Sequence, residues 1–204
     1  MNPKRMAWRI ALLVLVATPV CAAEVVINEV MYHPPPVVPE DRGLEWIELH
    51  NTGTNTVNLR GWQFTKGISY TFQSDILIPA GGYFLVVADT VRFEDYRPDL
   101  EGIVAGPWVG ALGNNGEEIE LVDALGEVQD SVAYANEGDW GTRVRGPLDR
   151  GSRGWDWFAE HDGLGKSLEL TQPLAPNDSG QNWAASLTVG GTPGAANSPR
   201  ASTT

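Results

Sequence analysis

Residues 45–50 read Glu-Trp-Ile-Glu-Leu-His, and this stretch decides the fold class. Ile47 and Leu49 share one parity while Trp46, Glu48 and His50 take the other, which is the two-residue period of a β-strand with one buried face. The residues that follow, 51–55, read Asn-Thr-Gly-Thr-Asn and have the composition of a turn. A short alternating segment that ends in a turn predicts a strand in a β-rich domain.

Similar short segments recur along the chain and are separated every dozen or so residues by turn signals. They are Glu24–Tyr32, Val57–Phe64, Tyr70–Phe72, Tyr83–Ala88, Glu118–Asp123, Val128–Tyr134 and Ser167–Leu170. Tyr83–Ala88 is apolar on both parities, so we expect a central strand covered on both faces. The apolar parity slips within Val57–Phe64, and a kink at Arg60-Gly61 would turn both halves inward. The pattern is typical of an all-β sandwich or barrel, without a tandem repeat or a helix of convincing length.

Three other places in the chain complete the expected layout. Thr90–Trp108 is mixed in composition and is expected to be a long connection. Asp130 shares the parity of its apolar neighbours, so it is expected either at an irregularity or buried with a partner. Gly190–Thr204 is rich in Gly, Pro, Ala, Ser and Thr, which predicts an unstructured terminus or the start of a linker.

The first 23 residues differ from the rest and predict a cleavable export signal. Three basic residues precede the apolar run Ile10–Ala17, and the small residues Ala22 and Ala23 offer a cleavage site. The run is too short to span a bilayer, which takes about 20 residues. Cys21 beside the site raises lipidation as the minor alternative, because the residues before it match a lipoprotein signal poorly. If Cys21 leaves with the signal, the remaining chain has no cysteine for a disulfide, a thiolate metal site or a nucleophile.

The net negative charge of the chain excludes some classes of binding partner. The chain has 14 Lys and Arg against 26 Asp and Glu, a net charge of −12. Loss of the signal removes three basic residues and leaves 11 against 26, a net charge of −15. Nucleic acids and anionic lipids bind clustered cations, so we expect neither nucleic-acid binding nor insertion into a membrane after cleavage.

Possible catalytic and metal-binding groups are few. Glu160-His161-Asp162 is the one dense cluster of ligand types, and Asp156 precedes it. Oxygen-rich loops can hold calcium, so Asp156, Glu160 and Asp162 are candidate calcium ligands, although a solvated acidic loop has the same sequence. No other cofactor is expected. A hydrolase that uses the Glu160-His161-Asp162 region is a further hypothesis, but the sequence lacks the catalytic constellation that such an enzyme needs.

Three glutamates fall on neighbouring candidate strands, namely Glu29, Glu45 and Glu48. They could be imagined as a glycosidase pair, but a small sandwich with short loops leaves little room for the necessary cleft. We therefore interpret them as carboxylates that point outward to solvent. His33 and His50 are interpreted as structural or surface residues.

Residues 137–162 form a Gly-rich insertion that contains Trp140, Trp155 and Trp157. Exposed indoles stack on sugar rings or anchor protein contacts. The alternative, which the sequence favours, is an insertion that folds back and buries the indoles as a small core. If the insertion has a contact surface, these three tryptophans are its candidate ligand-binding residues.

Taken together, the strand segments and their turns resemble the lamin-tail domain, in the version found in exported bacterial proteins. The residues that carry the resemblance are Val26–Tyr32, Glu45–Asn51, Leu59–Trp62, Ile78–Tyr83, Leu112–Glu117, Asp130–Tyr134, Gly165–Glu169, Asn182–Ala184 and Gly191–Asn197. No single motif is specific, but their order and spacing are. The resemblance covers about residues 24–198 and implies an immunoglobulin-like β-sandwich, a single domain. From their own composition, residues 1–23 are expected to be the signal peptide and 199–204 a disordered tail or linker start.

The family resemblance implies no catalytic residues, so we expect a protein that is not an enzyme. The first functional hypothesis is a secreted or envelope-associated binding or structural module for an extracellular protein or polysaccharide. The second is an accessory domain of a larger exported enzyme, because bacterial relatives often adjoin hydrolases or spore-coat-type kinases. The fold alone does not decide between them.

Overall fold

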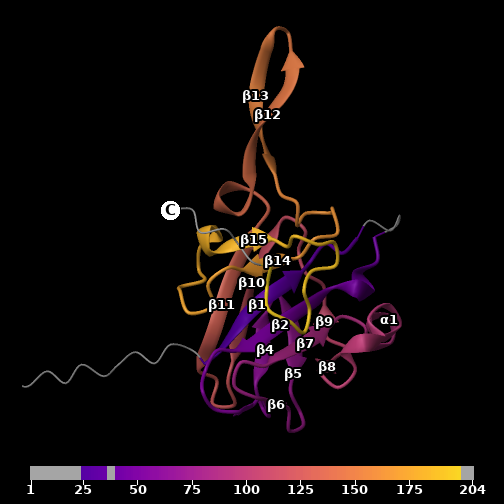
Figure 1. Cartoon of the computed structure of the whole chain (residues 1–204), viewed down its shortest axis with the longest axis vertical. Helices are drawn as coiled ribbons and strands as arrows, with labels where there is room; N and C mark the ends of the chain where they lie inside the picture. Colours follow the sequence, from indigo (N-terminus) through magenta and orange to yellow (C-terminus); the bar gives the residue numbers. More distant parts are fainter. Residues whose placement is uncertain (1–23, 36–39, 199–204) are drawn as a thin grey trace, which may run out of the picture.

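The computed structural model describes residues 24–35 and 40–198 (Figure 1). The expected signal segment with Cys21 and the expected tail 199–204 lie outside the described residues. Within the described part, two sheets face each other as a sandwich. The first runs in the order β15 (Trp183–Ala185), β14 (Leu168–Leu170), β1 (Val25–Met31), β2 (Trp46–Asn51), β7 (Tyr83–Val87) and β8 (Val104–Ala105). The second runs in the order β11 (Val128–Ala135), β10 (Gly116–Val122), β4 (Gln63–Lys66), β5 (Ile68–Thr71) and β9 (Val109–Gly110). The predicted immunoglobulin-like β-sandwich is confirmed.

The remaining strands form two separate pairs. β3 (Val57–Asn58) pairs with β6 (Leu77–Ile78), and β12 (Thr142–Asp149) pairs with β13 (Ser152–Phe158). The helical elements are η1 (Arg42–Leu44), α1 (Thr90–Tyr96), η2 (Pro98–Leu100), η3 (Gly138–Trp140) and η4 (Gly180–Asn182). None of the helices in residues 24–35 and 40–198 is long and apolar enough to cross a membrane.

The main core lies between the two sheets. Ile47 and Leu49 of β2 point into it, as their parity predicts, and both are fully buried. The other strands supply most of the remaining core side chains, including Ile27, Phe64 and Val132. Gly61 has φ +82° at the expected kink, which lets Leu59 and Phe64 both reach this core.

A second, smaller core lies on the outer face of the first sheet. Met31, Trp46, Leu85, Val87, Phe93 and Leu100 form it, beneath α1 and η2. The central strand β7 is therefore covered on both faces, as its sequence predicts. The expected long connection over Thr90–Trp108 instead contains α1, η2 and β8, and the side chain of Asp89 caps α1 by accepting the N–H groups of Val91 and Arg92.

Asp130 confirms both alternatives predicted for it. The β10–β11 register shifts beside its pair with Leu121, and its carboxylate is buried. One oxygen accepts the N–H of Ile27 at 2.6 Å, and the side-chain amide of Asn177 donates to the same carboxylate at 2.8 Å. Asp130 thus joins the second sheet to the first.

The predicted outward glutamates are the clearest error of the sequence interpretation. Glu29, Glu45 and Glu48 are fully buried, and Glu29 lies directly opposite Glu48 on one side and Glu169 on the other. Glu169, Glu29 and Glu48 thus form a row across β14, β1 and β2 on the outer face of the first sheet. The chain after β15, residues 186–198, covers this row, and we call it the C-terminal strap. The expectation that Gly190 onward is unstructured is wrong for the strap.

Backbone N–H groups of the strap account for its position. Thr192 donates to Glu29, Gly194 to Glu48, and Ser198 to Glu169. Burial raises the pKa of Glu29 to about 7 and raises the pKa of Glu48 well above its ordinary value. The glutamates were misassigned because the parity of a strand shows which residues share a face, but not what covers that face.

Candidate binding surface

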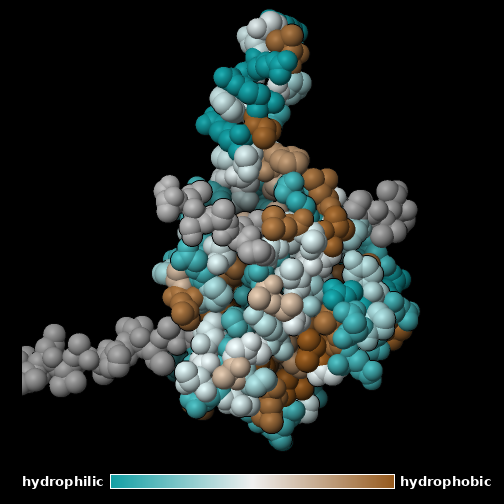
Figure 2. Space-filling model, in the orientation of Figure 1, coloured by the Kyte–Doolittle hydropathy of each residue, from teal (hydrophilic) through white to brown (hydrophobic). Residues whose placement is uncertain are grey.

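The hairpin of β12 and β13 stands clear of the sandwich, as Figures 1 and 2 show. We call residues 142–158 the arm. Its turn lies at Arg150 and Gly151, which have φ +47° and +85°, as a tight hairpin turn requires. Apart from Val144 and Gly146, every residue of the arm is exposed to solvent. The arm therefore presents both of its faces to the surroundings.

The pairing of the two strands sorts the side chains of the arm by charge. Arg143 lies opposite Trp157, Arg145 opposite Trp155, and Leu148 opposite Arg153. Residues that face each other across an antiparallel pair share a face, so these six side chains occupy one face of the arm. We call them the cationic ladder.

The other face of the arm carries its acidic residues. Val144 lies opposite Asp156, Asp149 opposite Ser152, and Thr142 opposite Phe158. The ladder face thus has three arginines and no carboxylate, whereas the opposite face has two carboxylates and no cation. This separation of charge gives the arm one face suited to anions.

The arginines of the arm differ from the cations of the sandwich in their partners. Within the described residues, every Lys and Arg outside the arm forms an ion pair with a carboxylate; these are Arg42, Arg60, Lys66, Arg92, Arg97 and Lys166. In the same part of the chain, no ion pair involves the four arginines of the arm, at 143, 145, 150 and 153. The arm therefore holds the guanidinium groups that are free to meet a ligand.

The two tryptophans of the ladder have different surroundings. Arg145 and Arg143 lie over the ring of Trp155, with guanidinium carbons 4.0 and 5.1 Å from the ring centroid. Such stacking holds a guanidinium flat on the indole and leaves its N–H edge available. Trp157 is 45% exposed and has no ring or cation contact within residues 24–35 and 40–198. Trp155 thus positions two arginines, and Trp157 offers a free aromatic face.

The base of the arm is tied to the sandwich through His161. The hydroxyl of Tyr32 lies 2.7 Å from Nδ1 of His161, and the backbone carbonyl of Trp140 lies 2.8 Å from Nε2. A carbonyl can only accept, so Nε2 carries the proton and Nδ1 accepts from Tyr32. Burial lowers the pKa of His161, which keeps the ring neutral. His161 is therefore a structural link between Tyr32, which directly follows β1, and η3 at the root of the arm.

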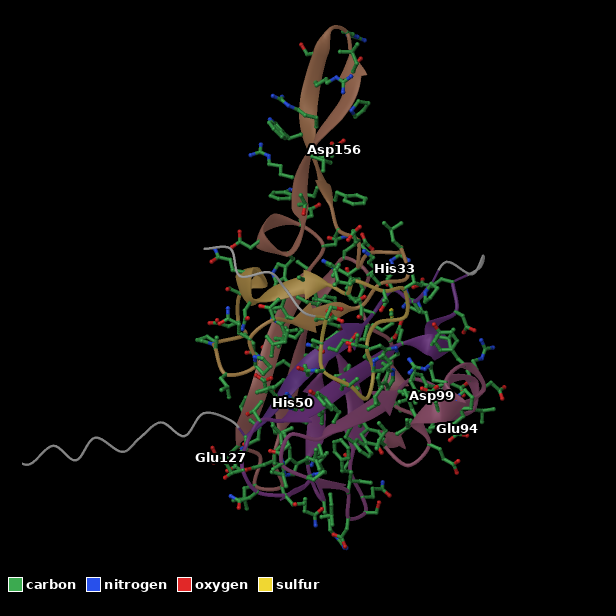
Figure 3. The ribbon with its side chains drawn as sticks, viewed as in Figure 1. His33, His50, Glu94, Asp99, Glu127 and Asp156 are labelled. Atoms are coloured by element: carbon green, nitrogen blue, oxygen red, sulfur yellow. The ribbon has the colours of Figure 1, made fainter. Side chains whose placement is uncertain are left out.

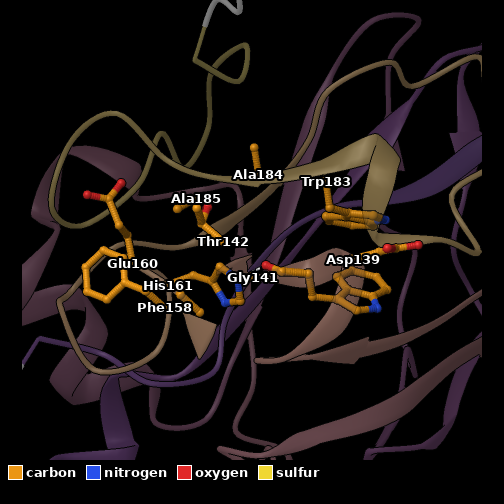
Figure 4. A pocket seen from close by; sticks show the side chains of 11 residues that line it. Asp139, Gly141, Thr142, Phe158, Glu160, His161, Trp183, Ala184 and Ala185 are labelled. Atoms are coloured by element: carbon orange, nitrogen blue, oxygen red, sulfur yellow. Dashed lines mark hydrogen bonds between the residues drawn. The ribbon is translucent and has the colours of Figure 1, made fainter. Parts of the chain in front are cut away.

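A hollow of about 430 Å³ lies beside this root (Figure 4). Its lining includes Trp140, Thr142, Phe158, Glu160, His161 and Trp183. The rings of Trp140 and Trp183 lie 6.0 Å apart at one end. Asp139 also lines the hollow, and its carboxylate makes the hollow a poorer site for an anion than the cationic ladder.

The structure separates the three candidate tryptophans. Trp155 and Trp157 lie on the ladder, 49% and 45% exposed, whereas Trp140 is half-buried against the core beside Trp183. The favoured interpretation of the insertion as a small core that buries all three indoles is wrong for Trp155 and Trp157. Apolar residues are too sparse in the arm to cover them, and strand pairing keeps the arm extended.

The candidate calcium ligands are not gathered into one site. Asp156 lies on the arm (Figure 3), Glu160 forms an ion pair with Lys166, and Asp162 accepts from the ring of His33 at 2.7 Å. No group of three His, Cys, Asp or Glu side chains able to hold a metal ion occurs in residues 24–35 and 40–198. The geometry gives calcium binding here no support, and it stays a prediction of the sequence.

The arginines of the ladder are the candidate residues that the sequence analysis missed. Arg143 and Arg145 alternate before the Arg150-Gly151 turn, and Arg153, Trp155 and Trp157 alternate after it. This two-residue period is present in the sequence, but it belongs to charged and aromatic residues, whereas the strands of the sandwich are marked by apolar ones.

Comparison with protein families agrees with this architecture. The family model described as Lamin Tail Domain matches residues 21–136, more than half of the 204 residues. Comparison with curated proteins gives no match. The matched region ends after β11, so the arm follows it in the sequence. With the two-sheet sandwich and this match together, the chain belongs to the lamin tail domain family.

Proposed function

We propose that this protein is an exported, non-catalytic module that binds an extracellular partner through the arm. The observation that carries the proposal is the contrast between the arm and the sandwich. The sandwich pairs its cations and buries its core, whereas the arm exposes unpaired arginines beside Trp155 and Trp157. Exposed aromatic and arginine side chains are the residue types that most often anchor binding surfaces.

Export is proposed from the basic start, the short apolar run and the small residues within positions 1–23. The absence of catalysis is proposed from the roles of the strongest candidate groups. His161 uses both ring nitrogens to hold the root of the arm, and Glu29 and Glu48 hold the strap. These groups serve the structure, which leaves them unavailable as a general base or a carboxylate pair.

Removal of the arm tests the proposal directly. Thr142 pairs with Phe158 at the root, so residues 142–158 can be replaced by a two-residue Asn-Gly turn without separating the strand ends. The full chain and this variant are compared for retention on cellulose, chitin, pectin, peptidoglycan and fibrillar extracellular proteins. We expect retention on at least one of these materials, lost in the variant with an unchanged melting temperature. Equal retention of both proteins, or of neither, overturns the proposal.

A further inference from the structure

We propose that the cationic ladder binds a linear acidic polysaccharide, whose sugar rings carry carboxylate groups. The inference rests on the proposed function and adds the class of ligand and the face that binds it. Three features of the ladder carry it, namely unpaired cations, an open indole, and a narrow, elongated shape.

The charge of the ladder selects an anion. Residues 142–158 contain four of the 11 basic residues that follow position 23, but only two of the 26 acidic ones. Both of those acidic residues, Asp149 and Asp156, lie on the opposite face. The guanidinium of arginine matches a carboxylate with two parallel hydrogen bonds, and Arg143 and Arg145 keep their N–H edges available over Trp155. A carboxylated ligand would therefore meet preoriented donors.

The indole of Trp157 selects a ligand that has rings. Its side chain is almost half exposed, on the same face as the arginines and across the strand pair from Arg143. The flat apolar face of a sugar ring packs on such an indole without needing a pocket, and an exposed amphipathic aromatic is suited to that contact. The pairing of Arg143 with Trp157 places a charge contact and a stacking contact side by side. Acidic sugars supply both groups within one repeating unit.

The dimensions of the ladder favour a thin polymer over a folded protein. Two paired strands of this length give a ribbon about 25 Å long and about 10 Å wide. One face of such a ribbon offers far less than the roughly 800 Å² that each partner buries in a stable protein–protein interface. A single polysaccharide strand needs only a narrow strip. The geometry therefore points to a chain that runs along the arm.

Binding of the full chain to polygalacturonate tests the inference, measured by calorimetry at low ionic strength. We expect saturable binding that weakens as sodium chloride is added, because salt screens exposed charges. Fully methyl-esterified polygalacturonate keeps the rings and loses the charge, and poly-L-glutamate keeps the carboxylates and loses the rings. Both are expected to bind about tenfold more weakly or worse, as is oligothymidylate.

Variants place the contact on the ladder. Trp157→Ala, and Arg143→Gln with Arg145→Gln, are each expected to weaken binding of polygalacturonate about tenfold or more. Phe158→Ala is the matched aromatic control, because Phe158 is also 45% exposed but lies on the other face and lines the hollow at the root. Arg60→Gln is the matched charge control, because Arg60 is exposed on the sandwich and paired with Asp75. Both controls are expected to bind as the unchanged protein does.

Several results overturn the inference while leaving the proposed function standing. If the methyl ester binds as well as polygalacturonate, the ladder does not recognise the carboxylate charge. If poly-L-glutamate or oligothymidylate binds equally well, the ladder does not recognise the acidic sugar ring. Loss in Phe158→Ala with binding kept in Trp157→Ala moves the site to the hollow. If the arm-less variant loses retention on the panel of materials but polygalacturonate does not bind the full chain, the arm binds a different partner. If the arm-less variant keeps all retention, the proposed function itself fails.

Discussion

Glu29 accepts the backbone N–H of Thr192 at 2.9 Å, although the two residues lie 163 positions apart. The contact joins the first strand of the domain to the strap that closes it. It belongs to a set of three, since Glu48 and Glu169 accept N–H groups from the strap in the same way. Stability of the native state is therefore linked to the protonation of buried carboxyl groups.

Stability is expected to depend on pH through Glu29. Burial raises its pKa from 4.5 to about 7, so the native state holds a proton that the unfolded chain releases between these values. The contribution of Glu29 to the free energy of unfolding is greatest below pH 4.5 and falls as the pH rises to about 7. Glu29→Gln is expected to flatten the decline, measured by urea denaturation at pH 5, 6, 7 and 8.

Comparison of the variant with the unchanged protein isolates Glu29 from other titrating groups. Burial also raises the pKa values of Glu45 and Glu48, so these groups add to the same decline. Burial lowers the pKa of His50 and His161, and below pH 6.5 this makes the free energy of unfolding rise with pH instead. Glu127→Gln, at an exposed position (Figure 3), is the control and should leave the profile unchanged. An identical slope in Glu29→Gln would contradict the linkage.

Gly191→Ala is expected to destabilise the strap. A Cβ at this position would lie 2.2 Å from Oε1 of Glu29 and 2.6 Å from the hydroxyl of Ser167, both of which are buried. We expect a loss of about 2–3 kcal/mol in unfolding free energy, from this clash together with the left-handed φ of +73°. Gly81→Ala has a similar φ of +70° with nothing within 4 Å, so it separates the backbone contribution and should lose only about 1 kcal/mol. Equal losses in the two variants would show that the strap yields without strain.

Asp130→Ala is expected to lower the unfolding free energy by about 1–3 kcal/mol, because it leaves the buried N–H of Ile27 without an acceptor. Asp130→Asn keeps one oxygen that can face this N–H and should lose less. Chemical denaturation of both variants measures the difference. A loss in Asp130→Ala no larger than in Asp130→Asn would indicate that Ile27 finds another acceptor.

Tyr32 and His161 are expected to act as a coupled pair. Tyr32→Phe removes the hydroxyl that donates to Nδ1 of His161. His161→Ala removes the ring that joins this hydroxyl to the carbonyl of Trp140 at the root of the arm. A double-mutant cycle should give a coupling energy of about 0.5–2 kcal/mol, because each variant removes the same contact. Additive losses would show that the hydrogen bond contributes nothing to stability.

Much of the sandwich could be predicted from sequence, because its strands have one dry face and therefore a clear period. Ile47 and Leu49 show this, and the kink at Gly61 was visible as a slip of parity. The row of glutamates was not predictable in this way, because its burial depends on a strap that is distant in sequence and poor in apolar residues. The arm was missed for the opposite reason: neither of its faces is buried, so no apolar period marks it. Trp155 and Trp157 were found as candidates by composition, without their arrangement.

The location of the arm makes the charge distribution of the molecule asymmetric. Its free positive charge gathers on one projecting hairpin, while the sandwich carries most of the 26 acidic residues. A molecule with such a dipole turns in the field of an anionic matrix before it touches it, because the sandwich is repelled and the arm attracted. Encounter would then occur arm first, and crowded molecules on one matrix would keep their acidic ends apart.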